Sequence, residues 1–390
     1  MTNQEYIDIS KVEMPKGLPK FNFYKKIKFY EVALSLFETC NLHCKFCFEQ
    51  HNKPIDYEKI KAFPERIIDA IRGDINKYRP QLFILKIWGG ELFFDSLPDD
   101  IFIVYYDLYK NIKTRIATEF PWMDFEVNWL SNGVWTKRNR VEKLLKKTNS
   151  KVALSYDPLE RFSNDLELQI WKSNFSYLKE KQLLNFIAIT LTKPNIYKYI
   201  NGEDKTLFDI PLNMQIDINY YAANPGWEKY IPSDEDLYKF FKWCIENKLF
   251  NVAAIESFVR HNIKEEKEHI PKWCTCKNSR QCIDGQPILD CVRQASSLPR
   301  KDFYGQYEPY TNENNCTEVK NSIGLLKRGC VTCEHYKTCP QLCWVSLIFK
   351  GYKTTYCPIK RLYETITEND IHNYLDWRDK YARNRVSIYA

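Results

Sequence analysis

The sequence contains no apolar run near the roughly 18 residues that a membrane-spanning helix requires. Its first residues, MTNQEYIDIS, lack both the basic start and the apolar stretch of a secretion signal. Low-complexity tracts are absent, and no internal repeat is visible beyond an alternation of strand-like and helix-like segments. We therefore expect a folded cytoplasmic protein without a membrane partner.

A large excess of charge of one sign is also missing. The net charge is +7 over 390 residues, and the densest basic run, KRNRVEKLLKK at 137–147, is typical of the solvated face of a helix. Hydrophobic residues make up 44% of the chain and charged residues 27%, so the chain can form a core and stay in solution. This balance predicts no nucleic-acid partner.

Cysteine is absent between residues 47 and 244, and this gap divides the 14 cysteines into two groups. Three lie at 40–47, and ten lie between 274 and 357. In a reducing compartment, dense cysteines are more often metal ligands or catalytic groups than disulfides. The distribution predicts two separate metal-binding regions.

The first group, Cys40, Cys44 and Cys47, has the spacing C-x3-C-x2-C and follows an apolar segment at 30–37 that predicts a buried strand. Three thiolates can hold a [4Fe-4S] cluster that would ordinarily take four, and the remaining iron is then free to bind another molecule. Tetrahedral zinc is the structural alternative, with His43 as a possible fourth ligand.

Apolar segments alternate with segments of helical periodicity along the first two thirds of the chain. A helix-sized interval separates each predicted strand from the next, and Ser233 with Asp236 predicts a capping box at the start of the last helix. We therefore expect an α/β protein with an open (β/α)6 partial barrel and a functional site at the carboxyl ends of its strands. The predicted strands are 30–37, 82–87, 125–130, 151–156, 186–192 and 214–221, and the predicted helices are 56–76, 97–119, 137–147, 165–181 and 234–247.

Four segments are expected along the chain. An extended lead-in at 1–29 precedes the barrel at 30–245, a cysteine-rich domain follows at 246–360, and the end at 361–390 is helical.

The loop ETCNLHCKFCFEQ at 38–50, with Phe46 directly before the third cysteine, resembles the signature of the radical S-adenosylmethionine (radical SAM) superfamily. The resemblance implies that the open iron of the cluster is chelated by the amino and carboxylate groups of S-adenosylmethionine. It also implies the partial-barrel fold expected from the strand pattern.

Further elements of that family follow the later strands. Gly89, Gly90 and Glu91 match its GGE element, which binds the amino group of S-adenosylmethionine, and glycines there allow close backbone approach. Asn132 lies in a Ser-Asn-Gly turn similar to the family's TNG turn. Ser155 begins an S-x-D element that could reach the ribose, although Pro158 departs from the usual continuation, and Asn195 is a candidate adenosine contact. Each of these short matches is also compatible with ordinary turn chemistry.

The carboxyl-terminal cysteines resemble the SPASM extension of radical SAM peptide-modifying enzymes. The run C-x2-C-x5-C-x3-C starts at Cys330, with Gly285 in the region upstream. The resemblance implies two auxiliary [4Fe-4S] clusters, and hence three clusters in all. Cys274 could replace Cys276 as a ligand, and Cys244 and Cys316 are expected to be buried thiols. A pair of structural zinc sites is the alternative for this region. The implied ligands are Cys276, Cys282, Cys291 and Cys343 for one cluster, and Cys330, Cys333, Cys339 and Cys357 for the other.

The resemblance also implies an activity. An electron from a donor such as flavodoxin or ferredoxin would pass through the first cluster to S-adenosylmethionine, and the resulting 5'-deoxyadenosyl radical would abstract a hydrogen atom from the substrate. Because most SPASM enzymes modify peptides or proteins, we expect a maturase that oxidises or cross-links a side chain. Since 29 lead-in residues cannot form a leader-binding domain, recognition would use a separate partner or the barrel itself.

The sequence is compatible with other activities as well. The sulfatase-maturing branch carries an acidic residue after the cysteine that corresponds to Cys291, whereas this chain has Val292, so that activity is not expected. A small-molecule dehydrogenase and a zinc-stapled, non-enzymatic binding protein are the other hypotheses. Candidate acids or bases, among which no spacing rule selects, are Asp157, Asp217, Tyr221 and Asp290.

Overall fold

The computed structural model describes residues 29–44, 47, 55–159, 161–220, 228–263, 279–283, 286–289, 330–335, 339 and 356–382. Within these ranges, no helix combines the length and the apolar character needed to cross a membrane.

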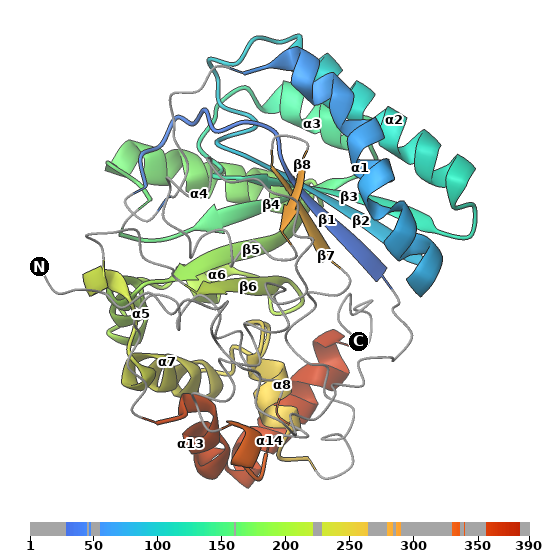
Figure 1. The fold of residues 1–390 in the computed structure, drawn as a ribbon. Helices are drawn as coiled ribbons and strands as arrows, with labels where there is room; N and C mark the ends of the chain where they lie inside the picture. Colours follow the sequence, from blue (N-terminus) through green and yellow to red (C-terminus); the bar gives the residue numbers. More distant parts are fainter. Residues whose placement is uncertain are drawn as a thin grey trace, which may run out of the picture.

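Six parallel strands form the centre of the fold (Figure 1). Each strand pairs with the strand that precedes it in the sequence, so the spatial order follows the chain order. This arrangement confirms the predicted (β/α)6 partial barrel and places the carboxyl ends of the six strands along one edge. The strands are β1 (Phe29–Ser35), β2 (Leu82–Trp88), β3 (Asp124–Ser131), β4 (Lys151–Tyr156), β5 (Leu184–Leu191) and β6 (Gln215–Tyr220).

Two further strands, which the sequence pattern did not predict, extend the sheet beyond β1. The strand β7 (Ser279–Ile283) pairs parallel to β1, and β8 (Gln286–Leu289) pairs antiparallel to β7. Cys282 is opposite Leu34 of β1 in this register. A segment of the cysteine-rich region therefore lies beside the strand that leads into the first cysteine loop.

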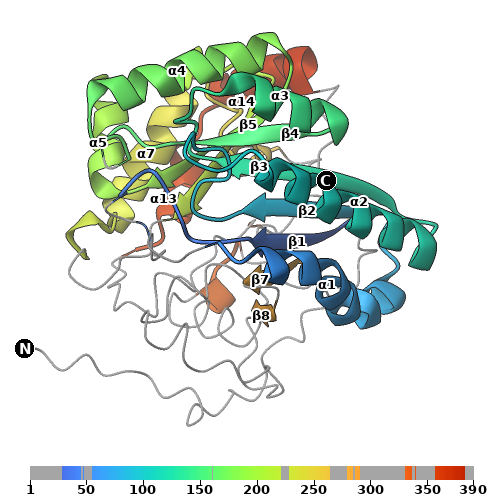
Figure 2. The same cartoon turned by 90° about the horizontal axis from the view of Figure 1, so that it is seen from above.

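Helices follow the strands as the periodicity predicted, and the expected capping box of Ser233 and Asp236 is present. Figures 1 and 2 show α1, α2 and α3 side by side on one face of the sheet. The shorter helices α5, α6 and α8 were not predicted. The helices are α1 (Tyr57–Tyr78), α2 (Ile101–Glu119), α3 (Arg138–Lys147), α4 (Asp165–Glu180), α5 (Lys193–Ile200), α6 (Thr206–Asp209), α7 (Asp234–Glu246), α8 (Ile255–Arg260), α13 (Pro358–Thr365) and α14 (Glu368–Trp377), with short 3-10 turns η2 (Glu228–Tyr230) and η6 (Cys330–Thr332) and a π-helical turn η7 (Arg378–Ala382).

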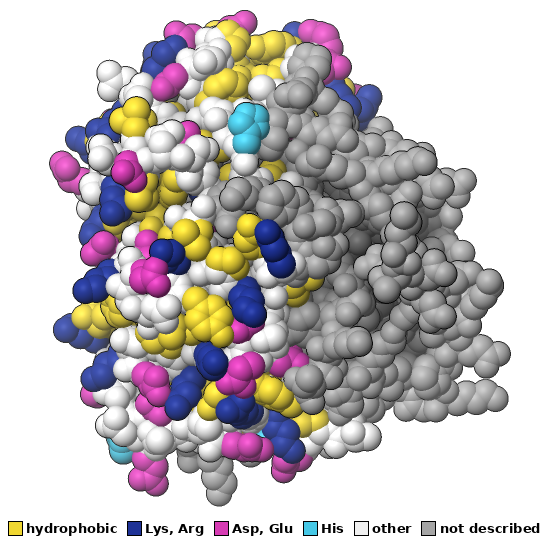
Figure 3. Space-filling view, turned by 90° about the vertical axis from the view of Figure 1, so that its left-hand side faces the viewer, with side chains coloured by type: hydrophobic (Ala, Val, Ile, Leu, Met, Phe, Trp, Pro, Cys, Tyr) yellow, Lys and Arg dark blue, Asp and Glu magenta, His cyan; other side chains and the backbone are white. Residues whose placement is uncertain are grey.

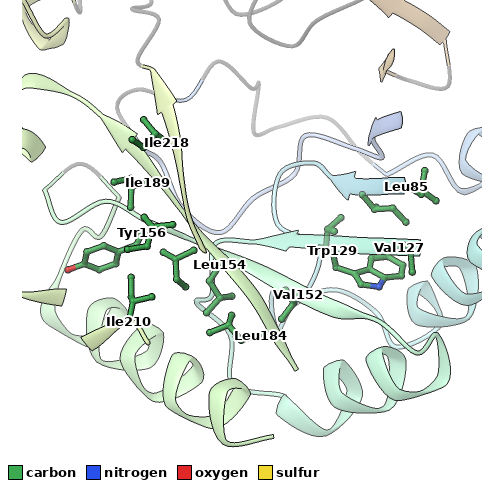
Figure 4. Packing of buried hydrophobic residues seen from close by; sticks show 14 of the residues in the cluster. Leu85, Val127, Trp129, Val152, Leu154, Tyr156, Leu184, Ile189, Ile210 and Ile218 are labelled. Atoms are coloured by element: carbon green, nitrogen blue, oxygen red, sulfur yellow. The ribbon is translucent and has the colours of Figure 1, made fainter. Parts of the chain in front are cut away.

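The core lies between the sheet and these helices. Leu154 and Tyr156 lie two positions apart on β4 and point toward the helices, as Figure 4 shows. The Tyr156 ring packs on Trp171 of α4 with 4.5 Å between ring centroids. Alternate residues of a strand face opposite sides, so the near-continuous apolar strands of this sheet bury both of their faces.

The carboxyl-terminal helices pack beyond β6, against α7 and α8 (Figure 1). Phe258 of α8 contacts Tyr363 of α13, and Tyr374 of α14 contacts Phe250. Val252 forms an isolated parallel bridge with Ile216 of β6. These residues join the same apolar core as the barrel. The expected boundary between barrel and cysteine-rich domain near residue 245 stays a prediction.

On the described part of the face drawn in Figure 3, basic and acidic side chains are interspersed rather than segregated. In the basic run of α3, Lys143, Lys146 and Lys147 are exposed, as expected of a solvated face. Arg140 departs from this expectation, because its side chain is mostly buried and donates to the Phe93, Phe94 and Leu97 carbonyls.

Candidate functional site

The first cysteine group lies directly beyond the carboxyl end of β1. Cys40, Cys44 and Cys47 are partly buried. The Cys47 amide donates to the Cys44 carbonyl at 3.0 Å, and the Leu42 amide donates to the Cys40 sulfur at 3.4 Å. The loop thus holds three thiols at the edge where the sequence predicted the site.

Gly89 and Gly90 connect the end of β2 to the backbone of this loop. The Gly90 amide donates to the Phe37 carbonyl at 2.7 Å, and the Glu91 amide donates to the Thr39 carbonyl at 2.9 Å. A Cβ atom on Gly90 would lie 2.0 Å from the Thr39 oxygen. Gly89 has a φ of +154°, which also favours glycine. Within the described structure, the backbone of the Gly-Gly-Glu element therefore packs closely against the backbone of the cysteine loop.

The Glu91 carboxylate is fully buried and links the ends of β2 and β3. It accepts hydrogen bonds from the Ser131 hydroxyl at 2.7 Å, the Phe93 amide at 2.9 Å and the Asn132 amide. Burial raises the pKa of Glu91 to about 7, and these donors oppose the rise. The predicted contact between Glu91 and S-adenosylmethionine stays a prediction, because the groups that donate hydrogen bonds to the Glu91 carboxylate here all belong to the protein.

Asn132 connects the turn after β3 to the cysteine loop. Its side-chain nitrogen donates to the Asn41 side-chain oxygen at 2.8 Å and lies 3.7 Å from the Cys40 sulfur. Asn41 in turn donates to the Val134 carbonyl at 2.8 Å. The structure therefore brings the predicted residues Glu91 and Asn132 together with the cysteine loop.

A buried ion pair lies beside the same loop. Both Nε and a terminal nitrogen of Arg161 donate to one Asp157 oxygen, at 2.9 and 2.7 Å, while the Thr190 amide donates to the other at 2.6 Å. Burial raises the pKa of Asp157 to about 6, against the opposing charge of Arg161. Sequence reasoning missed Arg161, and its only signal was a basic residue four positions after Asp157.

Arg161 also brings positive charge to the thiols. Burial raises the pKa of the Cys44 thiol, and the Arg161 guanidinium is the main opposing influence. The nearby Asp157, Cys44 and Cys47 raise the pKa of Arg161 in return. A cation beside two thiols stabilises their anionic forms, which are the forms that bind metal.

Three of the remaining predicted site residues, Ser155 in β4, Asn195 in α5 and Asp217 in β6, lie within the described structure. The Ser155 carbonyl accepts a hydrogen bond from the Trp171 ring nitrogen at 2.9 Å. Asn195 is buried in α5, and its side-chain oxygen has no hydrogen-bond partner among the described residues. Asp217 accepts from Gln215 within β6. Tyr221 and Asp290 lie outside the described residues.

A second cysteine group gathers around Tyr363 of α13. The Tyr363 hydroxyl donates to the Cys339 sulfur at 3.4 Å. Burial raises the pKa of Tyr363 well above its usual value, and Cys339, Cys357 and Cys333 add to the rise. The Cys333 amide donates to the Cys330 carbonyl at 3.0 Å. All four predicted ligands of one auxiliary cluster are partly buried, and one of them, Cys339, contacts Tyr363 directly.

Of the four ligands predicted for the other auxiliary cluster, Cys282 lies within the described residues. Cys276, Cys291 and Cys343 lie outside the described residues, as do Cys274, Cys316 and Gly285, and Cys282 is described through its place in β7. Cys244 is fully buried in α7, as expected of an apolar thiol.

The donor sets fit iron-sulfur clusters by their chemistry. Both described groups consist of partly buried cysteines, and Cys40, Cys44, Cys330, Cys339 and Cys357 pack against the apolar core. Within the described ranges, no three His, Cys, Asp or Glu side chains gather as they would around a single metal ion. Cysteine thiolates are the usual ligands of [4Fe-4S] clusters, and the described members of both predicted ligand sets are all cysteines.

Neither a family model nor a curated protein matches the sequence. Solved structures do match. Native anSMEcpe with bound AdoMet has a TM-score of 0.54 and 13% identity, with 90% of this chain and 97% of that chain covered. The same protein with bound AdoMet and the Cp18Cys peptide has a TM-score of 0.52, 13% identity and the same coverage.

SuiB of Streptococcus suis also matches, with a TM-score of 0.48, 17% identity, and 85% of this chain and 76% of that chain covered. The chain therefore has the α/β partial-barrel fold of radical SAM enzymes, as the resemblance in its sequence implied.

Proposed function

We propose that this protein is a radical SAM enzyme that reductively cleaves S-adenosylmethionine and abstracts a hydrogen atom from a peptide or protein, leading to oxidation or cross-linking. One observation carries the proposal. The loop of Cys40, Cys44 and Cys47 is fastened to the next two strand ends through Gly90 and Glu91 on one side and Asn132 on the other. These hydrogen bonds hold the loop that we propose binds the cluster at the carboxyl ends of the strands, where barrels of parallel strands carry their active sites.

Cys40, Cys44 and Cys47 would hold a [4Fe-4S] cluster, which, when bound, supplies an electron to S-adenosylmethionine and so generates a 5'-deoxyadenosyl radical. The protein contributes position and charge. Glu91 and Asn132 fix the loop, and Arg161 places a buried cation beside Cys44 and Cys47.

The binding of S-adenosylmethionine is assigned to the edge formed by the ends of β2 to β5. The residues proposed for it are Gly89, Gly90, Glu91, Asn132, Ser155 and Asn195. Asn195 offers the clearest support, because its buried side-chain oxygen lacks a hydrogen-bond partner among the described residues and so leaves an acceptor for an amine or a hydroxyl.

A peptide substrate is supported by the structural neighbour, since anSMEcpe is seen with a bound peptide. Cys330, Cys333, Cys339 and Cys357 would hold an auxiliary [4Fe-4S] cluster, and Cys276, Cys282, Cys291 and Cys343 a second one. A flavodoxin or ferredoxin would supply electrons, and a separate leader-binding protein could present the substrate.

The test begins with iron, sulfide and zinc per chain on protein purified without oxygen. Incubation with dithionite and S-adenosylmethionine is then assayed for 5'-deoxyadenosine. We expect about twelve irons per chain, from three clusters of four, and formation of 5'-deoxyadenosine. Zinc without iron or cleavage would contradict the proposal and favour a zinc-stapled protein.

A matched pair of variants locates the first cluster. Cys44→Ala should abolish cleavage and remove about four irons, the content of one cluster. Cys244→Ala makes the same substitution at a thiol buried within α7 and should leave cleavage and iron content unchanged. Full cleavage by Cys44→Ala would overturn the assignment of the first cluster.

A further inference from the structure

Tyr363 contacts Cys339, one of the cysteines proposed to hold an auxiliary cluster. It belongs to α13, the helix that Cys357 caps at its N-terminus. Its ring is 6% exposed, and its hydroxyl donates to the Cys339 sulfur at 3.4 Å. The Cys339 backbone is fixed as well, because its amide donates to the His335 carbonyl at 2.7 Å.

Two histidines hold the tyrosine ring in place. The His261 ring, just after α8, stacks on the Tyr363 ring with a centroid distance of 3.8 Å and an interplanar angle of 19°. His335 meets the same ring edge to face at 5.0 Å. His261 Nε2 and His335 Nδ1 lie 3.0 Å apart, so the two histidines also contact each other. The Tyr363 ring therefore packs between His261, which follows α8, and His335, which lies between Cys333 and Cys339. These contacts fix the direction in which the hydroxyl points.

We infer that the Tyr363 hydroxyl tunes the reduction potential of the cluster held by Cys330, Cys333, Cys339 and Cys357. This inference rests on the proposed function, which places a cluster there. A neutral phenol donates a hydrogen bond to the cysteine sulfur. Reduction adds negative charge to a cluster and its sulfur ligands, so the hydrogen bond stabilises the reduced form more than the oxidised form and raises the potential. His261 is a positioning residue that acts through the ring of Tyr363.

The experiment is an EPR-monitored redox titration of the holoenzyme, purified without oxygen, in wild type and Tyr363→Phe. Phenylalanine keeps the ring that stacks on His261 and deletes only the donor. We expect one midpoint potential to fall in Tyr363→Phe. At a fixed potential the ratio of reduced to oxidised cluster should decrease roughly tenfold, which corresponds to a shift of about 59 mV for a one-electron couple. The signal that responds to added S-adenosylmethionine identifies the first cluster, whose midpoint should not move.

Tyr374→Phe is the matched control. It removes the hydroxyl of a fully buried tyrosine on the neighbouring helix α14, where the hydroxyl donates to Glu256 at 3.4 Å. All midpoints should stay at their wild-type values. If Tyr363→Phe fails to retain iron, His261→Leu replaces it in the titration, because this variant frees the ring without removing the hydroxyl and should lower the same midpoint.

The outcomes separate the two proposals. Full iron content with unmoved midpoints in Tyr363→Phe, or in His261→Leu where that variant is used, would overturn the role of Tyr363 and leave the proposed function standing. Wild-type protein with only about four irons, the content of one cluster, would overturn the auxiliary clusters and the role of Tyr363 together. In that case S-adenosylmethionine cleavage would still report on the first cluster.

Discussion

The side chain of Asn132 donates a hydrogen bond to the side chain of Asn41 at 2.8 Å, across 91 positions of the sequence. This bond joins the turn after β3 to the loop that carries Cys40 and Cys44. A second bond from Asn41 to the Val134 carbonyl closes the connection. The cysteine loop is thereby positioned by side chains from another strand as well as by its own backbone.

The first prediction concerns this link. Asn41→Ala removes both hydrogen bonds and should lower the rate of S-adenosylmethionine cleavage about tenfold, as is typical when groups that orient metal ligands are lost. Asn185→Ala is a suitable control, because it breaks another Asn-Asn bond, from Asn185 to Asn128 at 2.6 Å, away from the cysteine loop. Iron content and cleavage are measured together. Equal effects from the two substitutions would refute a specific role for Asn41.

The second prediction concerns the glycine at the end of β2. Gly90→Ala would place a Cβ atom 2.0 Å from the Thr39 oxygen, so the cysteine loop must move. We expect loss of about four irons, one cluster's content, and a lower urea midpoint of unfolding. Gly73→Ala, in α1, is the control, since its Cβ meets nothing within 4 Å, and alanine should stabilise the helix by up to about 1 kcal/mol. Wild-type iron content in Gly90→Ala would contradict the close contact.

The third prediction concerns pH. Burial raises the pKa of Glu91 from 4.5 to about 7, so the folded state binds this proton more tightly than the unfolded state. The stabilisation that results is fully present below pH 4.5 and is lost as the pH rises to about 7. It amounts to about 3 kcal/mol for a shift of this size.

Glu91→Gln cannot titrate and should lose this part of the pH dependence. It should also be less stable than wild type at pH 7, because its amide nitrogen would face one of the three donors that the carboxylate now satisfies. Urea midpoints of both proteins at pH 5 and pH 7 test this. Parallel midpoints in the two proteins would show that Glu91 does not titrate in this range.

The fourth prediction concerns the buried ion pair. Arg161→Leu leaves Asp157 buried without its cation and should destabilise the protein by about 3–5 kcal/mol. The double variant Arg161→Leu/Asp157→Leu removes both charges and should recover much of that stability. It should not recover S-adenosylmethionine cleavage, because the cation beside Cys44 and Cys47 is still missing. Wild-type cleavage in the double variant would show that Arg161 serves stability alone.

The barrel could be predicted from the sequence because buried parallel strands form near-continuous apolar runs, such as LFILKI before Trp88. The strand β7 was missed because SRQCI is short and polar. A signal was present nonetheless: Asp284 and Gly285 separate the residues of β7 and β8, and this dipeptide is typical of two-residue hairpin connections.

The candidate site was only partly predictable. The spacing C-x2-C-x5-C-x3-C predicted a metal-binding group that starts at Cys330, and the family resemblance added Cys357. This ligand set stays a prediction. The contacts that position these groups come from distant segments. The spacing of Arg161 four positions after Asp157 is also typical of an exposed ion pair on a helix. The local sequence does not indicate that this pair is buried or that it lies near Cys44. The ring stack of Tyr363 on His261 likewise joins residues about a hundred positions apart.

The pairing of β7 with β1 has a consequence for how the chain is made. Glu31 of β1 meets its partner Ser279 of β7 only after a further 248 residues, from 32 to 279, have been synthesised. At about 5–20 residues per second this takes about 12–50 s, during which one hydrogen-bonding edge of a buried strand lacks its neighbour. A nascent chain in this interval carries an open strand edge, the kind of surface on which misassembly begins.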